Sequence, residues 1–324
     1  MRTSLITVAN LAMTRNVEAM RDFHAILDER RAQVNARLDE LLSATGFEQS
    51  EANELVKYTF RTGGKRLRPV LVLLACESIG GDATHALDGA VAIEFLHAAS
   101  LVFDDLIDRH RVRRNLPTTQ HAFADDKAIS AGLFLASKGV QILSEYKDPR
   151  ITRIAGWGLV DLSKGEILDV TTELAIDVEQ YLAIADLKTG SLFSAAAGVG
   201  GVLGGATADE VNSLYNYGRA VGIAFQIKDD ILDQSSDPER RERVNLVVMH
   251  YLDEATKKQR ITNLLDNQKG KVDMSLLYEK ALELAMQKSR EHVEKAKQQL
   301  NGLPLREERR LLEQFADYAL EREF

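Results

Sequence analysis

Prolines are scarce in this chain, and their scarcity limits the fold more than any other feature. The chain has 324 residues but only five prolines, namely Pro69, Pro117, Pro149, Pro238 and Pro304. The segments between them are rich in alanine, leucine, glutamate and lysine, which favour helices, whereas a proline inside a helix would break it. Apolar residues recur three or four positions apart, as at Leu87, Val91 and Phe95. The sequence therefore predicts an all-α fold of ten or more helices.

Short motifs mark the boundaries between these helical segments. Gly80-Gly81-Asp82 separates the helix after Pro69 from one beginning near Thr84, and Thr207 is placed to cap a further helix. No alternating strand pattern with an Asn-Gly or Asp-Gly turn is present, and no linker rich in serine, glycine or proline. We therefore expect residues 1–20 to be disordered or loosely attached and residues 21–324 to form one helical domain.

Charge and cysteine content exclude several classes of protein. The net charge is −8 and the pI about 5.5, so the whole molecule does not attract polyanions. The single cysteine, Cys76, has no intrachain partner, which fits a reducing cytoplasm. The N-terminal residues lack the apolar core of a signal peptide. The most apolar stretch, 86–103, is interrupted by Asp88 and Glu94, so we expect no transmembrane segment.

Two copies of one short acidic motif are the main chemical signal. Asp-Asp-Leu-Ile-Asp occupies 104–108 and Asp-Asp-Ile-Leu-Asp occupies 229–233, each after an apolar run. In a helix, positions four apart lie on one face, so Asp104 and Asp108 can aim two carboxylates at one point. Asp229 and Asp233 can do the same.

Clustered carboxylates repel one another unless a cation lies between them. Oxygen ligands with room for water and phosphate suit magnesium. A single motif of this kind could equally be a charged helix end that meets solvent. Two copies that oppose the helix dipole in the same way favour a metal site instead.

Basic residues gather in three places. Gly63-Gly64-Lys65-Arg66-Leu67-Arg68-Pro69 contains three cations, Arg109 to Arg114 follow the first acidic motif, and Lys188-Thr189-Gly190 adds a lysine beside a hydroxyl. Arginine and lysine bind phosphate oxygens. A nucleic-acid surface would use the same residues, but the acidic total and the lack of interleaved aromatic residues argue against it.

His97 lies seven residues before Asp104 in the same apolar run. A lone histidine in such a run is more often a satisfied core residue. Seven residues is close to two helical turns, however, so His97 shares the face of Asp104. This spacing favours a contact with substrate.

Together these residues resemble the trans-isoprenyl diphosphate synthases, the polyprenyl synthetase family. The resemblance runs from about residue 55 to about residue 235 and rests on the order GGKRLRP, HAASLVFDDLID, RRNLPT, KTG and FQIKDDILD. It implies a helical bundle around a deep central cavity, a homodimer, and magnesium as cofactor, with about three ions bound with diphosphate. The substrates would be isopentenyl diphosphate and an allylic diphosphate.

The resemblance also implies a role for each motif residue. The implied metal ligands are Asp104, Asp108, Asp229 and Asp233, and the implied catalytic set contains Asp104, Asp105, Asp108, Arg113, Lys188, Asp229 and Asp230. Arg113, Lys188, Thr189 and Gln226 would hold the allylic diphosphate. Lys65, Arg68, His97 and Arg114 would hold isopentenyl diphosphate. Cations at these places stabilise a departing diphosphate, and an apolar pocket protects the resulting carbocation from water.

Product length depends, by the same resemblance, on the helix before Asp104. The residues five and four positions upstream, Ala99 and Ser100, are small and would let the chain grow past them. A helical turn rises about 5.4 Å, comparable with an isoprene unit, so a stop at Leu96 would permit a further addition. We therefore expect a product of geranylgeranyl length or longer.

The sequence departs from the family pattern at several places. Leu133 stands where the family usually has aspartate, Asn115 where it has glycine, and Glu166 where glutamine is common. The segment after Asp233 lacks the usual Gly-Lys, and Arg243 is a candidate replacement for that lysine.

Three alternatives follow from these departures and from the shared metal chemistry. The chain could be a non-catalytic or regulatory subunit of a heteromeric synthase, although both aspartate motifs are complete. It could be a shorter-chain farnesyl diphosphate synthase. A class I terpene cyclase would share the metal chemistry, but such enzymes generally lack a second full aspartate triplet and the GGKRLRP element.

Overall fold

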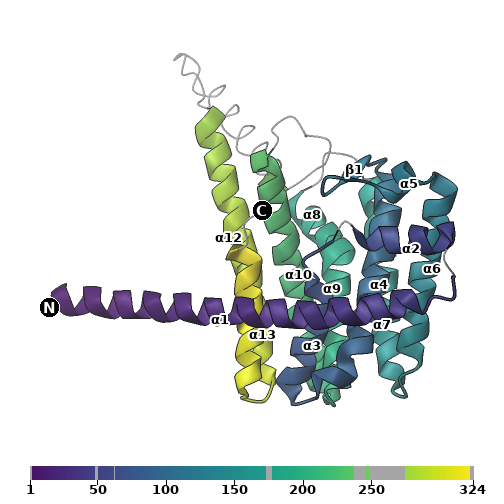
Figure 1. Cartoon of the computed structure of the whole chain (residues 1–324). Coiled ribbons are helices and arrows are strands. Elements are labelled where there is room, and N and C mark those ends of the chain that lie inside the picture. The colour runs from purple at the N-terminus through teal and green to yellow at the C-terminus, as the bar shows by residue number, and fades with distance from the viewer. Residues whose placement is uncertain are drawn as a thin grey trace, which may run out of the picture. The chain divides into compact units, whose positions relative to one another are not determined.

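The computed structural model describes residues 2–47, 50–61, 63–172, 177–236, 246–247 and 274–321. These residues form helices and one short β-hairpin (Figure 1). The all-α fold predicted from periodicity is confirmed. The chain divides into two compact units: residues 1–152, 199–206 and 304–314 form the first, and residues 153–198, 207–303 and 315–324 form the second. Each unit is described by itself below, and the single domain predicted over 21–324 stays a prediction.

The first unit begins with the long helix α1 (Arg2–Ser43). From Phe23 onward its buried residues fall on one stripe, which includes Leu27, Val34 and Leu38. This stripe packs on helices α3 (Leu67–Ile79) and α4 (Ala83–Ile107). The backbone of residues 2–20 is helical, but their side chains are not described, so the loose attachment expected for 1–20 stays a prediction.

Helices α3 and α4 are apolar on nearly every side, as expected of helices enclosed in a core. Their boundary is the predicted one: Asp82 caps α4 by accepting from the backbone N–H of Thr84 at 2.8 Å. By length and composition α4 could cross a membrane, but 67% of its most apolar window is buried inside the protein. Such burial is typical of a core helix, and α4 carries the first acidic motif at its C-terminal end.

The rest of the first unit surrounds α4. Helix α2 (Glu51–Arg61) precedes α3, and α4 leads through strands β1 (Val112–Arg113) and β2 (Leu116–Pro117) to α5 (Thr119–Ala122) and α6 (Asp125–Ser144). Helix α6 packs closely along α4, because Gly132 and Gly139 leave room for Phe103 and Leu96. Helix α7 (Pro149–Thr171) begins in this unit and continues into the second.

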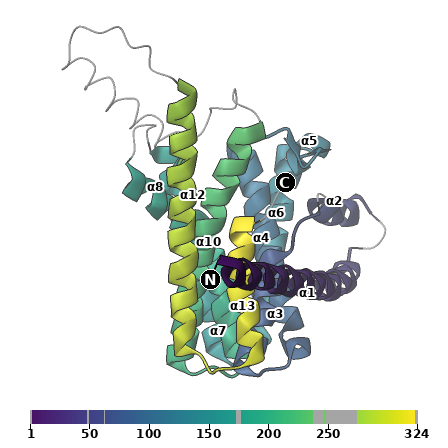
Figure 2. The ribbon, with the colours of Figure 1, turned by 90° about the vertical axis from the view of Figure 1, so that its left-hand side faces the viewer.

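The second unit contains helices α8 (Val178–Ala185), α9 (Ser191–Leu203), α10 (Ala208–Ser236), α12 (Met274–Gln299) and α13 (Glu307–Glu321), some of which it shares with the first unit. Helix α10 begins at the predicted cap: Thr207 and Glu210 bond each other's backbone N–H groups. Helices α10 and α12 lie side by side (Figures 1 and 2). The Ser289 hydroxyl of α12 donates to the Ala224 carbonyl of α10 at 3.0 Å.

Candidate active site

The first acidic motif lies where α4 ends and the chain reverses direction. Asp108 follows the last helical residue, Arg109 has a left-handed φ of 54°, and the His110 N–H donates to the Asp105 carbonyl at 3.0 Å. This is a Schellman ending with arginine at the position that glycine usually takes. A left-handed non-glycine residue costs about 1 kcal/mol. The reversal places His110 beside the carboxylates of the helix end.

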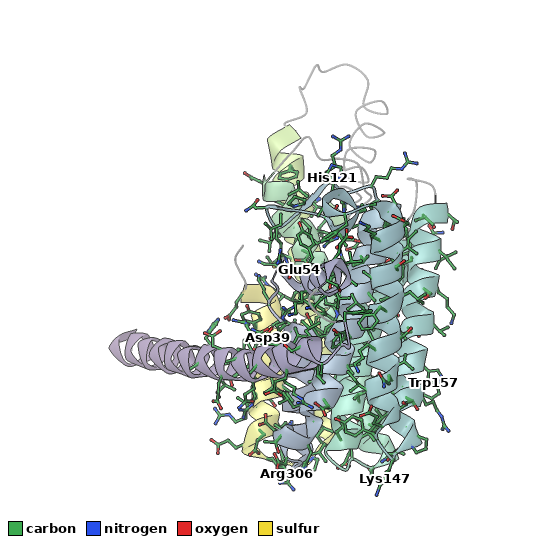
Figure 3. The ribbon with its side chains drawn as sticks, turned by 45° about the vertical axis from the view of Figure 1, so that its right-hand side comes forward. Asp39, Glu54, His121, Lys147, Trp157 and Arg306 are labelled. Atoms are coloured by element: carbon green, nitrogen blue, oxygen red, sulfur yellow. The ribbon has the colours of Figure 1, made fainter. Side chains whose placement is uncertain are left out.

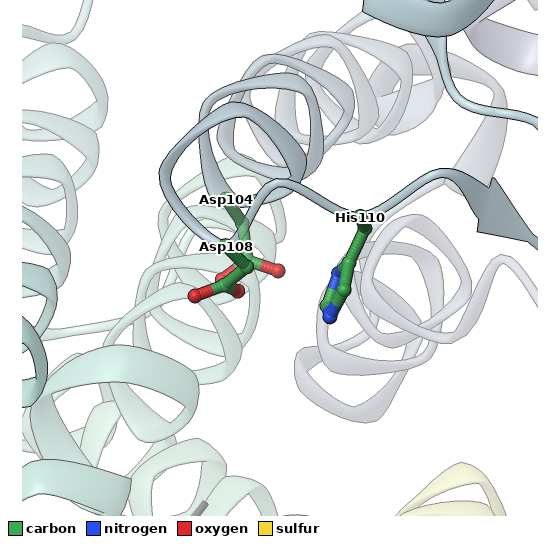
Figure 4. Close-up of side chains that lie close together, drawn as sticks. All are labelled: Asp104, Asp108 and His110. Carbon is green, nitrogen blue, oxygen red and sulfur yellow. The ribbon is translucent and has the colours of Figure 1, made fainter. Parts of the chain in front are cut away.

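Asp104, Asp108 and His110 form a cluster at this reversal. One ligand atom from each lies within 4.8 Å of the others. Figure 4 shows the three side chains close together. The structure thus brings together the two carboxylates that the spacing predicted, and it adds a histidine that we did not predict. Two carboxylates on one helical turn fit a hard divalent cation such as magnesium, with room for phosphate oxygens.

Asp105, in contrast, faces inward and holds Arg113. Its side chain is buried, and the Arg113 Nε donates to Oδ1 at 2.9 Å and to Oδ2 at 3.0 Å. A terminal nitrogen of the same guanidinium donates to Asp104 Oδ2 at 3.0 Å. Arg113 therefore bridges Asp105 and one of the two clustered carboxylates, which sets a cation at the edge of the candidate metal site.

A two-residue turn holds Arg113 in this position. Strands β1 and β2 pair antiparallel, with Arg113 opposite Leu116. Between them Arg114 and Asn115 have φ values of 50° and 63°, as in a type I′ turn. Asparagine tolerates this conformation better than most residues, which explains how it can stand where the family has glycine. We did not predict this hairpin from the sequence.

The cations of the GGKRLRP segment differ in how deeply they are buried. Arg66 turns inward, where its guanidinium donates to Glu94 at 2.6 Å and to Asn35 at 3.0 Å. Only 8% of the Arg66 side chain and 5% of the Glu94 side chain are exposed. Arg66 therefore anchors the segment to α1 and α4. Lys65 and Arg68, the two cations predicted to bind substrate, stay partly exposed on either side of it.

Arg68 contacts the predicted histidine. Its guanidinium lies 3.0 Å from His97 Nε2. Burial, followed by the positive charges of Arg68 and Arg114, holds the pKa of His97 well below 6.5. His97 is therefore neutral at physiological pH and accepts from Arg68 through Nε2, which leaves its proton on Nδ1. The Arg114 guanidinium donates to the Gly63 carbonyl at 2.6 Å, so the hairpin and the GGKRLRP segment meet here.

The predicted chain-length residues lie on two faces of α4. Ser100 is partly buried on the turn before Asp104, and its hydroxyl donates to the His97 carbonyl at 2.8 Å. Ala99 and Leu96 are buried. Leu96 packs against Gly139 of α6. Ser100 is thus on the side of Asp104, whereas Leu96 is turned toward α6.

In the second unit, Lys188 and Thr189 lie in a π-helix, η1 (Asp186–Gly190), between α8 and α9. Such wider turns are frequent at functional sites. Glycines on two neighbouring helices make room for it. A Cβ atom at Gly165 of α7 would lie 2.5 Å from the backbone nitrogen of Lys188, and one at Gly222 of α10 would lie 2.6 Å from the Gly190 Cα.

Two carboxylates of α7 hold the Lys188 ammonium. Its Nζ lies 2.7 Å from Asp169 Oδ2 and 3.0 Å from Glu166 Oε2. Glu166 is the residue that replaces the glutamine common in the family. In this chain the lysine is therefore balanced by two negative charges, where glutamine would leave one.

A hydrogen-bonded chain links Thr189 to the second acidic motif. The Thr189 hydroxyl donates to Gln226 Oε1 at 2.7 Å, and Gln226 Nε2 donates to Asp230 Oδ1 at 2.9 Å. Asp230 is buried and also accepts from the Tyr181 hydroxyl and from the Leu246 N–H. Burial raises the pKa of Asp230 to about 7 although these donors lower it. Asp230 is therefore the buried, hydrogen-bonded aspartate of the second motif, as Asp105 is of the first.

The other residues of the second motif are described less fully. Asp229 is partly buried on α10. Asp233 lies on the same helix, but its side chain falls outside the part of the chain that the structure describes. Arg243 also lies outside the described residues. Their predicted roles, and the predicted cavity joining the two motifs, stay predictions.

Comparison with known proteins identifies the family. The family model described as polyprenyl synthetase matches residues 49–285. A short chain isoprenyl diphosphate synthase of Methanothermobacter thermautotrophicus is 31% identical, with 95% of this chain and 98% of that protein covered. A geranylgeranyl diphosphate synthase of Methanosarcina mazei is also 31% identical, with coverages of 92% and 97%.

Solved structures agree. The crystal structure of a decaprenyl diphosphate synthase from Rhodobacter capsulatus superposes with a TM-score of 0.80 at 30% identity, covering 94% of this chain and 100% of that one. The family match, the two full-length relatives and the shared helical fold lead to one conclusion. The chain belongs to the polyprenyl synthetase family and is a polyprenyl diphosphate synthase, a prenyltransferase of isoprenoid biosynthesis.

Proposed function

We propose that this enzyme condenses isopentenyl diphosphate with an allylic diphosphate, in the presence of magnesium, to give geranylgeranyl diphosphate or a longer product. The observation that carries the proposal is the pair Asp104 and Asp108 at the end of an apolar helix, with Arg113 bridging Asp104 and Asp105. Diphosphate binding needs cations, and the carboxylates supply them indirectly by holding metal. We also propose that the reaction takes place in the cytoplasm.

The allylic diphosphate is assigned to the acidic motifs and their cations. Asp104 and Asp108 would hold magnesium, which when bound neutralises the charge that develops on the departing diphosphate. Arg113 adds a fixed cation beside them. By the family resemblance, Lys188, Thr189 and Asp229 of the second unit would bind the same diphosphate. Gln226 positions Thr189 through the 2.7 Å hydrogen bond.

Isopentenyl diphosphate is assigned to the cluster of Lys65, Arg68, His97 and Arg114. Arginine offers paired donors to phosphate oxygens, and lysine offers a point charge. The neutral His97 contributes an Nδ1–H donor without adding a third charge beside Arg68 and Arg114. Arg66 is not part of this cluster, because Glu94 and Asn35 already hold its guanidinium.

The bond changes then follow. The allylic carbon–oxygen bond breaks, and both of its electrons leave with the diphosphate. The double bond of isopentenyl diphosphate attacks the allylic carbon and forms the new carbon–carbon bond. A proton is lost to restore a double bond, and the released diphosphate is a suitable base. The predicted apolar cavity beside α4 would exclude water, which would otherwise capture the cation.

The product length is the finer part of the proposal. The relatives named above range from short-chain to decaprenyl enzymes, so their names do not decide it. Ser100, on the side of α4 that carries Asp104, is small, and so is the neighbouring Ala99. Ser100→Phe should therefore shorten the product, because a ring on this face blocks a growing chain. Chromatography of the dephosphorylated alcohols measures it, and an unchanged product distribution would contradict the argument.

One experiment tests the activity itself. The purified chain is incubated with magnesium, isopentenyl diphosphate and each of three allylic primers, dimethylallyl, geranyl and farnesyl diphosphate. We expect linear alcohols of geranylgeranyl length or longer after dephosphorylation, and no product with EDTA. A product that stops at farnesyl length would identify a shorter-chain synthase. Product only after a second synthase subunit is added would favour the regulatory-subunit alternative.

We also propose that the enzyme is a homodimer. On α6 the exposed side chains of Ile129, Leu133 and Val140 follow helical spacing, and 64% of Leu133 is exposed. On α7, Trp157 is 56% exposed and points away from the ribbon (Figure 3). Apolar stripes of this kind are usually covered by a partner. Sedimentation equilibrium would give twice the chain mass if a second copy covers them.

A further inference from the structure

Helix α6 has a gap at Gly139, here called the notch, which faces the predicted chain-length residue Leu96 of α4. A Cβ atom at Gly139 would lie 2.7 Å from Leu96 Cδ2, 2.9 Å from Leu96 Cγ and 2.9 Å from the Ala92 carbonyl oxygen. A side chain at 139 fits only if Leu96 moves and α6 also shifts slightly away from the Ala92 carbonyl, because a backbone contact is not relieved by a change of rotamer. The notch and the Leu96 side chain therefore belong together.

The register of the two helices repeats this arrangement. Seven residues before Gly139, Gly132 receives Phe103 of α4, and a Cβ there would lie 2.8 Å from the Phe103 ring. Leu96 and Phe103 are also seven residues apart. Seven residues is about two helical turns, so one face of each helix makes both contacts. This face of α4 is distinct from the one that carries Asp104.

Leu96 lies at the edge of the face along which a growing chain would pass. It is four residues before Ser100, which is roughly 6 Å along the helix and about 40° around it. Ser100 and His97, on that side, are both partly exposed. Ala99 and Phe95, on the other side, are buried, and Phe95 packs on Phe60. A Leu96 side chain displaced from the notch would therefore turn toward the partly exposed side of the helix, where Ser100 lies.

We propose that Gly139 is a specificity-determining residue for product length. Because position 139 has no side chain, Leu96 can lie against α6, away from the face that carries Ser100. Filling the notch would turn Leu96 into a stop one turn beyond Ser100. The inference rests on the proposed function, and it adds a residue of α6 that touches neither diphosphate nor metal.

Gly139→Ala is the direct test. We expect its longest product to be shorter than that of the wild type by at least one isoprene unit, with kcat/KM for the first condensation unchanged. In the Leu96→Ala background the same substitution should not shorten the product, because no long side chain is left to displace. A merely structural effect would instead lower the rate and leave the product length as it was.

The matched control is Gly156→Ala on α7, where no atom lies within 4 Å of the added Cβ. It should keep the wild-type product. If Gly139→Ala is insoluble, Leu96→Phe takes its place, because a ring too large for the notch must also leave it. A wild-type product distribution from either soluble variant would overturn the inference. A wild-type enzyme that makes no prenyl product would overturn the proposed function instead, so the two failures are distinguishable.

Discussion

Arg66 and Arg68 are two positions apart in the sequence, and we predict opposite consequences for their removal. Arg66→Met leaves Glu94 without the guanidinium that lies 2.6 Å from its carboxylate. Both side chains are almost fully buried, so water cannot replace the lost partner. Removing one member of a buried ion pair typically costs roughly 3–5 kcal/mol. A domain has a net stability of about 5–15 kcal/mol, so this loss is a large share of it.

The reason lies in the remaining charge. Glu94 is on α4 and packs inside the first unit, so an unpaired carboxylate there must either stay charged or take up a proton. The double variant Arg66→Met/Glu94→Leu removes both charges and keeps an apolar interior. It should therefore recover most of the stability that Arg66→Met loses.

Urea unfolding followed by circular dichroism measures these effects. Arg68→Met is the matched control, because Arg68 is partly exposed and its hydrogen bond joins it to the neutral His97, so its removal leaves no buried charge unpaired. It should keep a urea midpoint near that of the wild type but raise KM for isopentenyl diphosphate. A wild-type midpoint for Arg66→Met, or an equal loss in both single variants, would refute the reasoning.

Two further predictions concern other charged groups. Burial lowers the pKa of His292 on α12 from 6.5 to about 4, so as pH falls between these values the unfolded chain takes up a proton that the folded chain excludes. Stability should fall by about 3 kcal/mol over that window, and His292→Leu should remove this pH dependence in urea titrations; equal slopes for both proteins would contradict it. Glu166→Gln removes one of the two carboxylates at Lys188 and should lower KM for the allylic diphosphate, whereas Glu179→Gln on α8 should leave it unchanged. A higher KM in the Glu166 variant would show that the second carboxylate helps rather than opposes binding.

Local signals in the sequence predicted much of the fold. Proline scarcity and helical periodicity predicted the all-α class, and the Thr207 cap marks the start of α10 as expected. The spacing of Asp104 and Asp108 also predicted their convergence, because positions four apart on a helix are neighbours whatever the rest of the chain does. These features depend on residues that are close in the sequence.

Features that depend on distant residues were not predictable. Nothing near Arg66 shows that it turns inward while Arg68 does not, because its partner Glu94 lies 28 residues away. The π-helix at Lys188 depends on room left by Gly165 and Gly222 on two other helices. The hairpin at Arg113 has a turn of arginine and asparagine, which lacks the glycine that usually signals a type I′ turn.

The left-handed backbone positions bear on how this enzyme could be engineered. Among the described residues four non-glycine positions have positive φ, namely Arg66, Arg109, Arg114 and Asn115, and three of them are arginine. Glycine or asparagine would suit that conformation better, and a screen for heat resistance would select them. Such a screen would discard positive charge from the neighbourhood of the diphosphates. Libraries for thermostability should therefore hold these arginines constant and vary the chain elsewhere.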